Sequence, residues 1–238
     1  MGVYTFDNFR DYLKLRFGNA DEFESPINYY GIWTNNAYRQ LTTKDRLILP
    51  DSGGRGNVFK LKLPELETDT TKTTTDGQAY ITTPTDALIV RHIFDETNDR
   101  KLKWIPWARY VKYTDRADTA AEGDPTEWHH RGANTYLHST PDDSVTSLRV
   151  YYKKRYTALS AGTDVTLLGA EWDDVVLELA FIEGNRWLNR WDLAKAAQAS
   201  LVEMVSGLIT VYDTEEKDRD EFWRPDPAYN QRGSHYGD

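Results

Sequence analysis

The sequence contains no cysteine. Disulfide bonds and thiolate chemistry are therefore excluded at the start. It also has no apolar run near the roughly 18 residues of a membrane-spanning helix, and its N-terminal MGVYTFDNFRDYL lacks the basic and apolar regions of a signal peptide. We therefore expect a protein with its own folded core that does not enter a membrane.

Basic residues are fewer than acidic residues. The chain has 29 Lys and Arg residues against 38 Asp and Glu residues, which gives a net charge of -9 and a pI near 5.1. Non-specific binding to a polyanion gains affinity by releasing counterions from phosphates, and an acidic protein gains little in this way. Any contact with DNA is therefore expected to be local or loose.

Catalytic signatures are missing as well. GGRGN at residues 53–57 lacks the lysine and hydroxyl residue of a phosphate-binding loop, and no serine stands in a nucleophile elbow. The neighbouring acids Asp173 and Asp174, or Glu65 and Glu67, would serve a glycosidase only if folding placed two carboxyl groups across a cleft. We therefore predict no catalytic residue and no enzyme.

Metal ligands do not cluster along the chain. His129 and His130 are adjacent, so a strand would direct them to opposite faces. DETNDR at residues 95–100 begins with calcium-loop spacing, but Arg100 stands where that loop needs glycine. We predict no metal site, no cofactor, and a hairpin turn at residues 95–100.

Aromatic side chains are plentiful. The chain has eight tryptophans and fifteen tyrosines. These residues are favoured where a wet surface becomes covered by a partner, because one end of the ring is apolar and the other can form a hydrogen bond. The composition therefore favours an interaction protein.

Helical spacing of apolar residues marks both ends of the chain. In the first segment Phe9 and Leu13 belong to such a pattern, and SP at residues 25–26 has the composition of a helix start. Near the other end, a stripe from Trp172 to Trp187 predicts the buried face of a helix. The predicted helices cover residues 5–17, 26–43, 171–190 and 192–212, the last two as an antiparallel hairpin.

Alternating apolar and polar residues mark the middle of the chain. This period predicts strands in VFKLKL (58–63), ALIVRHIF (87–94), KLKWIPW (101–107) and LRVYYKKRY (148–156). The threonine-rich segment at residues 67–77 is predicted to be a polar loop. The predicted fold is α+β: one domain at residues 1–212, with a helical core from both termini and a β-rich insertion at about residues 57–160.

The segment LRVYYKKRY combines rings and cations. In a strand, Leu148 and Val150 would face one side, as in an ordinary half-buried sheet. Lys153, Lys154 and Arg155 still form a cluster. Two interpretations stay open for it: a contact with DNA or an acidic partner, or a basic patch at the end of a strand.

Residues 213–238 are predicted to be a C-terminal tail. Its first part, DTEEKDRDE, has opposite charges at helical spacing and would prolong the last helix at most to the residues before Pro225. Large rings follow without large aliphatic residues to form a core. We predict that the tail docks on a partner through Phe222, Trp223, Arg224 and Tyr229; the alternative is an end without a partner.

The order of these features resembles the phage head-to-tail adaptor family, also called head completion or neck connector proteins. In the segment at residues 123–160, a glycine and a proline precede an aromatic residue, and a strand, a proline-aspartate turn and a tyrosine-rich strand follow. The loop at residues 50–76 and the tail after residue 213 have no counterpart in this resemblance. The similar segments are YYGIWTNNAYRQLTTKDR (29–46), GQAYITTPTDALIVRHIFDETNDRKLKWIPW (77–107), GDPTEWHHRGANTYLHSTPDDSVTSLRVYYKKRYTALS (123–160) and EWDDVVLELAFIEG (171–184).

The resemblance implies a structural bacteriophage protein of the virion neck, present in the host cytoplasm during assembly. It implies a homo-oligomeric ring, a dodecamer, that binds the portal protein and the tail, stopper or nozzle proteins. Such a ring extends the DNA channel for genome ejection without sequence-specific contact. Two other functions stay open: a carbohydrate-binding or carbohydrate-acting protein with a tryptophan-lined surface, and a DNA-packaging protein that uses Lys153, Lys154 and Arg155.

Overall fold

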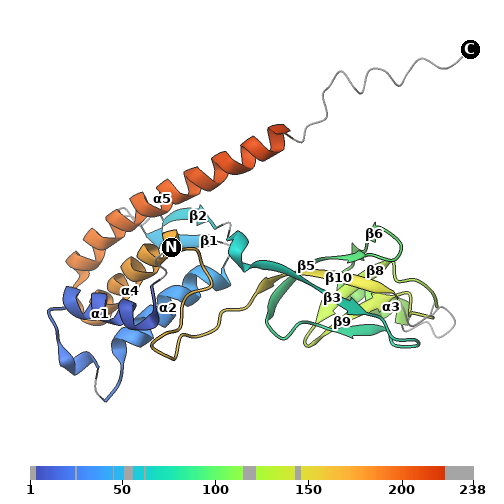
Figure 1. The fold of residues 1–238 in the computed structure, drawn as a ribbon, viewed down its shortest axis with the longest axis horizontal. Helices are drawn as coiled ribbons and strands as arrows, with labels where there is room; N and C mark the ends of the chain where they lie inside the picture. Colours follow the sequence, from blue (N-terminus) through green and yellow to red (C-terminus); the bar gives the residue numbers. More distant parts are fainter. Residues whose placement is uncertain are drawn as a thin grey trace, which may run out of the picture. The chain divides into compact units, whose positions relative to one another are not determined.

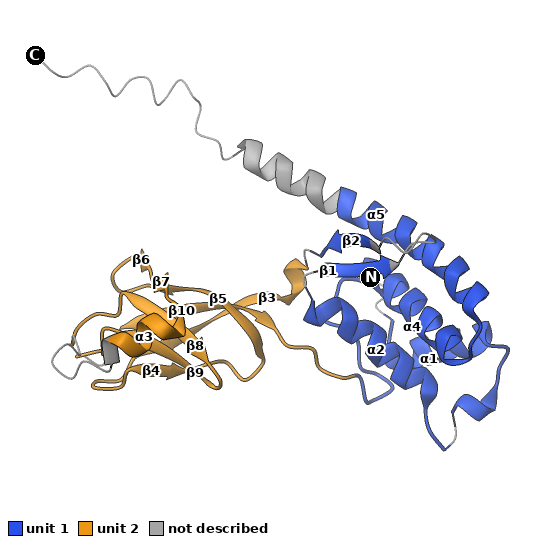
Figure 2. Ribbon diagram, turned by 180° about the vertical axis from the view of Figure 1, so that it is seen from behind, with its two compact units in different colours: residues 1–62, 159–238 blue, residues 63–158 orange. Residues whose placement is uncertain are grey.

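Helices occupy both ends of the chain and strands occupy its middle (Figure 1), which confirms the predicted α+β fold class. The chain divides into unit 1, residues 1–62 and 159–238, and unit 2, residues 63–158 (Figure 2). The computed structural model describes the backbone of residues 4–24, 26–44, 46–50, 56–61, 63–114, 122–142 and 146–222, and the side chains of all of these except 50, 56, 113, 114 and 211–222.

Unit 1 is a helical bundle with one β-hairpin. Helix α4 packs against α1, α2 and α5, while α2 and α5 contact the two strands of the hairpin. The strands β1 and β2 pair in antiparallel fashion. The elements of unit 1 are α1 (Phe6–Arg16), η1 (Asp21–Phe23), α2 (Tyr29–Thr43), β1 (Arg46–Pro50), β2 (Gly56–Lys60), η4 (Ala170–Trp172), α4 (Asp173–Trp187) and α5 (Trp191–Phe222).

Side-chain caps fix where the first two long helices begin. The Thr5 side chain accepts a hydrogen bond from the backbone of Asn8, whose side chain in turn accepts one from the Thr5 backbone, and this capping box starts α1 at Phe6. The start predicted for α2 at residue 26 is wrong. The Asn28 side chain accepts from the backbone N–H of Gly31 at 2.8 Å, so the helix begins at Tyr29 instead.

The bundle core consists of large rings and aliphatic side chains from all four long helices. It includes Phe9, Leu13, Tyr30, Trp33, Tyr38, Leu41, Trp172, Val176, Leu179, Leu201 and Val205, each no more than 5% exposed. These positions follow the three-to-four residue spacing on each helix, which is why the helices bury one face each.

Helix α5 is the longest element of the chain and continues to Phe222. It therefore passes residue 212, where the predicted helix ended and the predicted tail began. No proline stands within this helix, and the next one is Pro225, which permits the added turns. Figure 1 shows α5 continuing past the ends of the shorter helices of unit 1.

In the part of unit 2 that the structure describes, the strands form two four-stranded sheets, ordered β3-β10-β5-β6 and β4-β9-β8-β7. All pairs are antiparallel except β7 with β8. The elements of unit 2 are η2 (Pro64–Leu66), β3 (Glu67–Thr73), β4 (Tyr80–Thr82), β5 (Ala87–Asp95), β6 (Arg100–Lys101), β7 (Lys103–Trp104), α3 (Trp107–Thr114), β8 (Glu127–Arg131), β9 (Asn134–His138) and β10 (Ser147–Lys154).

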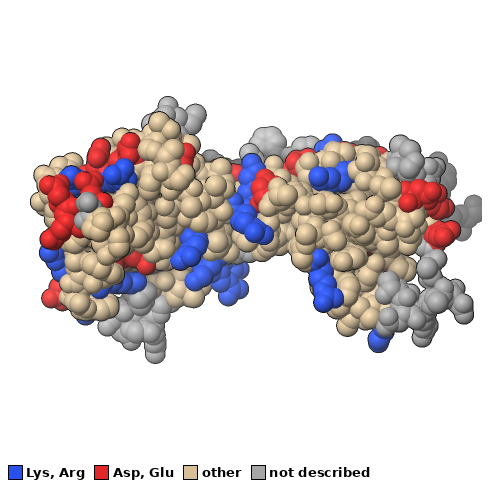
Figure 3. Space-filling model, turned by 90° about the horizontal axis from the view of Figure 1, so that it is seen from below, with Lys and Arg blue, Asp and Glu red and all other residues tan. Residues whose placement is uncertain are grey.

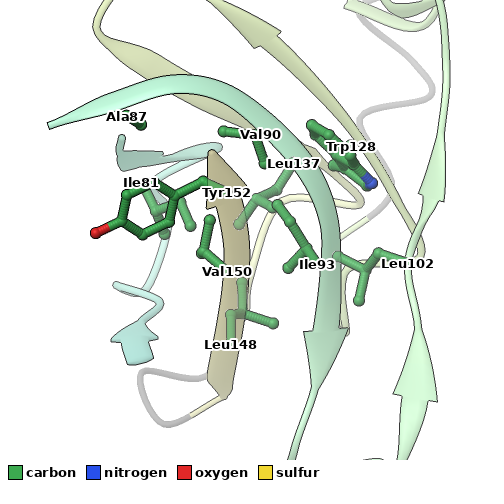
Figure 4. Packing of buried hydrophobic residues seen from close by; sticks show 10 residues of the cluster. All are labelled: Ile81, Ala87, Val90, Ile93, Leu102, Trp128, Leu137, Leu148, Val150 and Tyr152. Carbon is green, nitrogen blue, oxygen red and sulfur yellow. The ribbon is translucent and has the colours of Figure 1, made fainter. Parts of the chain in front are cut away.

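The inner faces of the two sheets form the core of unit 2 (Figure 4). Leu148, Val150 and Tyr152 of β10 point inward, as the alternation in that segment predicted. They share one cluster with three side chains of the second sheet: Ile81 of β4, Trp128 of β8 and Leu137 of β9. Strand β5 pairs with β6 across residues 96–99, which confirms the turn predicted there.

The loop predicted at residues 67–77 is wrong for its first part. Residues 67–73 form β3, which pairs with β10 along its length. Its side chains alternate between exposed and half-buried, and threonine is β-branched, which suits an edge strand of a sheet. The polar composition of the segment thus concealed a strand with one solvated face.

Helix α3 was also missed, since its first residue falls in a segment predicted to be a strand. Pro106 precedes the helix, and its carbonyl accepts from the backbone N–H groups of Arg109 and Tyr110. The helix packs on the outer face of the second sheet: the Tyr110 and Tyr136 rings lie 5.5 Å apart. Tertiary packing therefore selected a helix in a short segment whose own pattern was ambiguous.

Candidate interaction surfaces

A groove lies between α2 and α4 of unit 1. Its volume is about 370 Å³. The side chains that line it come from one face of each helix: Tyr29, Ile32, Trp33, Asn36, Glu183, Arg186 and Trp187. We call these seven residues the α2–α4 groove.

The floor of the α2–α4 groove is held by a cluster of stacked rings. Trp33 is 2% exposed, and its ring centroid lies 5.2 Å from that of Phe17. Glycine at position 184 lets α4 approach this cluster, since an added Cβ would lie 2.7 Å from Phe17 and 2.8 Å from Trp33. The floor is therefore closely packed at this position.

The rim of the groove, by contrast, presents apolar surface to solvent. Trp187 is 53% exposed and Ile32 is 45% exposed, although the helical stripe predicted Trp187 to be buried. The Trp187 ring packs against Tyr29 at 4.8 Å and covers the outside of the cluster rather than entering it. Close by in sequence, Trp191 is 55% and Leu193 is 50% exposed. Exposed apolar side chains that line one groove, as Trp187 and Ile32 do, are typical of interaction sites.

Two opposite charges accompany the apolar rim. Glu183 is half-buried and accepts a hydrogen bond from the Gln40 side chain at 2.9 Å. The pKa of Glu183 is raised above its ordinary value, because the effect of burial exceeds the opposing effects of Arg186 and the Gln40 hydrogen bond. The groove can therefore offer a ligand one carboxylate and one guanidinium beside its rings.

The four predicted tail residues stand at or beyond the end of α5. Phe222 is the last residue of the helix, and its side chain is not among those described. Trp223, Arg224 and Tyr229 lie outside the described residues. Their role in docking stays a prediction.

The three residues of the predicted basic cluster do not share one exposed surface. Lys153 is 2% exposed, because bulges in the pairing of β10 with β5 place it and Tyr152 in succession among buried residues. Lys154 is half-buried. Arg155 is exposed, and its guanidinium donates to the Ala87 carbonyl at 3.4 Å. Lys153 in this arrangement cannot meet DNA, which leaves Lys154 and Arg155 for such a contact.

Charge is mixed on the face that Figure 3 presents. Figure 3 shows Lys and Arg in separate small groups, with Asp and Glu between and beyond them, on the described part of the face it presents. In unit 2, ion pairs such as Arg91 with Glu67 at 3.1 Å and Arg109 with Glu127 at 3.2 Å join opposite charges. On the described part of this side, the distribution gives little support to a broad DNA-binding face.

Rings also gather on the outer face of the second sheet in unit 2. Trp107 contacts His129 and Tyr136, with ring centroids 5.3 and 5.7 Å apart, and the Arg131 guanidinium lies 4.2 Å from the Trp107 ring. These contacts attach α3 to the sheet. Trp104, at 54% exposure, is left as the most exposed tryptophan of this unit. A single tryptophan that is more than half exposed in this unit is a weak basis for a tryptophan-lined sugar-binding surface.

The residues considered for chemistry have structural partners. His129 contacts the Ile105 carbonyl, whereas His130 contacts the Thr83 hydroxyl, so the two rings serve different neighbours. Asp173 is 1% exposed and accepts from the Tyr4 backbone N–H and the Thr166 hydroxyl. Among the described residues, no group of three His, Asp or Glu side chains could hold a metal, and no helix is long and apolar enough to cross a membrane.

Comparison with known proteins adds one finding to this geometry. A family model described as SU10 adaptor protein matches residues 5–227 of the chain. The match spans the loop at residues 50–76 and the first part of the tail, for which the resemblance in the sequence offered no counterpart. No curated protein matches the chain.

Proposed function

Because the chain belongs to the SU10 adaptor protein family of phage head-to-tail adaptors, we propose that it forms a dodecameric ring between the portal and the tail. The observation on which this proposal depends is the family match over residues 5–227. A structural head-tail connector of the virion needs surfaces rather than a reaction centre. The ring would extend the DNA channel, assemble in the host cytoplasm and remain in the neck during genome ejection.

The exposed tryptophans support the proposed assembly. Trp104, Trp187 and Trp191 are each more than half exposed. A tryptophan carries about 150 to 250 Å² of surface, so covering the exposed half gives about 2 to 3 kcal/mol at about 25 cal/mol per Å² before ordering costs. Two or three such rings per interface supply a useful part of the free energy of association.

The charge of the chain supports a passive DNA channel. Each copy has a net charge of -9. A ring of acidic subunits repels the DNA backbone, which allows the duplex to slide without sequence-specific binding. Measured binding of the isolated protein to duplex DNA is expected to be weak. Tight binding with a steep salt dependence would instead favour a DNA-packaging protein that uses Lys154 and Arg155.

The tail is the proposed docking segment, through Phe222, Trp223, Arg224 and Tyr229. Deleting residues 213–238 should leave a folded protein that no longer attaches to the portal. Since α5 continues to Phe222, a second deletion of residues 223–238 separates the tail from the helix. Electron microscopy of each purified variant with and without its portal measures attachment. Normal attachment of both variants would refute the docking role.

A further inference from the structure

The α2–α4 groove has the properties of a receptor for an aromatic segment, and the chain itself contains one. We propose that the groove binds the segment around Trp223 and Arg224 of a second copy of this chain. This inference rests on the proposed function only in assuming that copies stand side by side. It names the groove as the partner of the tail, whereas the portal was the partner considered above.

The first argument is the match between the apolar surfaces. The groove has a buried ring at its floor, Trp33, and two half-exposed apolar side chains at its rim, Ile32 and Trp187. Its volume of about 370 Å³ lies in the range of small ligand pockets. The segment FWRPDP at residues 222–227 offers two adjacent rings between an acidic helix end and prolines. Inserting one ring would cover Trp187 and Ile32 from solvent.

The second argument is charge. In the groove, Glu183 and Arg186 stand one helical turn apart on α4. In the segment, Arg224 directly follows Trp223, and Asp226 stands two residues after Arg224. A ring seated against Trp187 allows Arg224 to pair with Glu183 and Asp226 to pair with Arg186. The half-buried Glu183 would gain a cation there, which stabilises its ionised form.

The third argument is reach, which excludes the chain's own groove. Helix α5 begins at Trp191, only a few residues after Trp187, and its 32 residues span about 48 Å. Phe222 therefore lies more than about 30 Å from Trp187 of the same copy, even with the connection fully extended. Trp223 is one residue further, and Tyr229 can move at most about 25 Å from Phe222. Trp223 of the same copy therefore cannot reach the groove, so a Trp223 ring that fills it must come from another molecule.

Contacts of this kind join different surfaces of identical subunits. Such a head-to-tail interface propagates from copy to copy and closes into a ring when the rotation permits. The long α5 would extend across toward the neighbour and place Trp223 in its groove. In a free monomer, the apolar rim of the α2–α4 groove would remain exposed to solvent.

Photo-crosslinking tests the contact directly. Full-length protein with Trp223 replaced by p-benzoylphenylalanine is mixed with isotope-labelled normal chain, irradiated and digested. We expect cross-links from position 223 to residues 29–36 or 183–187 of the labelled chain. The mixture is kept at about 0.5 mM, where even a site with a Kd of about 0.1 mM is mostly occupied. Cross-links only within one chain, only on unit 2, or none at this concentration would overturn the proposal.

Two sets of variants sharpen the test. Trp187→Ala should lower the cross-link yield at least about tenfold, whereas Trp104→Ala, at nearly the same exposure on unit 2, should leave it unchanged. Glu183→Arg and Arg224→Glu should each lower the yield, and the double variant should restore it, which no loss of folding would imitate. Equal effects of both tryptophan variants, or no rescue by the charge swap, would contradict the assigned contact.

The outcome can be separated from that of the proposed function. A neck ring containing this chain, together with absent cross-links, would overturn the groove contact and leave the adaptor role intact. Cross-links in solution, together with particles whose neck lacks the chain, would support the groove contact and overturn the adaptor role.

Discussion

Replacing Gly184 by alanine tests whether the groove floor is as tightly packed as the structure indicates. Gly184 lies in α4, where alanine normally stabilises a helix by about 1 kcal/mol relative to glycine. At this position the new Cβ would lie 2.7 Å from Phe17 and 2.8 and 2.9 Å from two carbon atoms of Trp33. Real Cβ contacts are longer than this, so a ring or the helix must move.

The size of the effect follows from two opposing contributions. Overpacking a core costs about 1 to 3 kcal/mol, and here the upper half of that range applies because Phe17 is held by Phe23, Tyr30, Trp33 and Phe181, with ring centroids 5.0 to 6.2 Å away. Subtracting the gain in helix propensity leaves a net decrease of about 1 to 2 kcal/mol in the free energy of unfolding.

Gly207→Ala is the matched control. Gly207 lies in α5 and is exposed, and a Cβ added there would meet no described atom within 4 Å. The substitution should therefore stabilise by about 0.5 to 1 kcal/mol. Urea unfolding followed by fluorescence measures the total stability, and hydrogen exchange of peptides from α4 reports on unit 1 alone. Equal stabilisation by the two variants would refute the close approach of α4 to the ring cluster.

Three further predictions concern buried groups. Burial raises the pKa of Asp173 above its ordinary 3.8, so the folded state binds the proton more tightly than the unfolded state. Relative to Asp173→Asn, the wild type should therefore gain stability as the pH falls from about 7 to about 4. A stability difference between the two proteins that stays constant with pH in urea titrations would contradict this. Arg16→Ala leaves the Glu178 carboxylate, which is 9% exposed, without its bidentate partner and should lower stability by about 1 to 3 kcal/mol. This range is reduced because Arg16 is itself 36% exposed. The control Lys103→Ala loses a surface ion pair of 3.9 Å and should change stability by less than about 0.5 kcal/mol. Leu148→Ala creates a cavity between the sheets of unit 2 and should cost about 2 to 5 kcal/mol, seen as faster exchange in β5 and β10, while Ile89→Ala at 40% exposure should cost less than about 1 kcal/mol.

Local signals in the sequence were sufficient where one pattern dominated. Phe9 and Leu13 lie on the buried face of α1, and the inward side of β10 is the one that alternation predicted. These elements depend on a single period and on a nearby cap or turn. Where two patterns competed, prediction failed. The threonines of β3 are polar enough for a loop and β-branched enough for a strand, and pairing with β10 decided between them.

The candidate site could not be predicted in the same way. The groove joins residues 29–36 with residues 183–187, and no spacing of residues in the sequence predicts that contact. Composition could not tell which tryptophans are covered: Trp33, Trp128 and Trp172 are buried. Trp187 is the last residue of α4 and stays 53% exposed although its ring packs against Tyr29, so periodicity alone misassigned it. The burial of Lys153 depends on a bulge, which is also invisible in the sequence.

Electron cryomicroscopy of the intact phage neck tests the central claim most directly. We predict a symmetric ring directly beneath the portal, into which unit 1 and unit 2 each fit as separate bodies, one pair for each subunit. A neck reconstruction that is fully explained by other polypeptides, with this chain absent or located elsewhere in the particle, would contradict the claim.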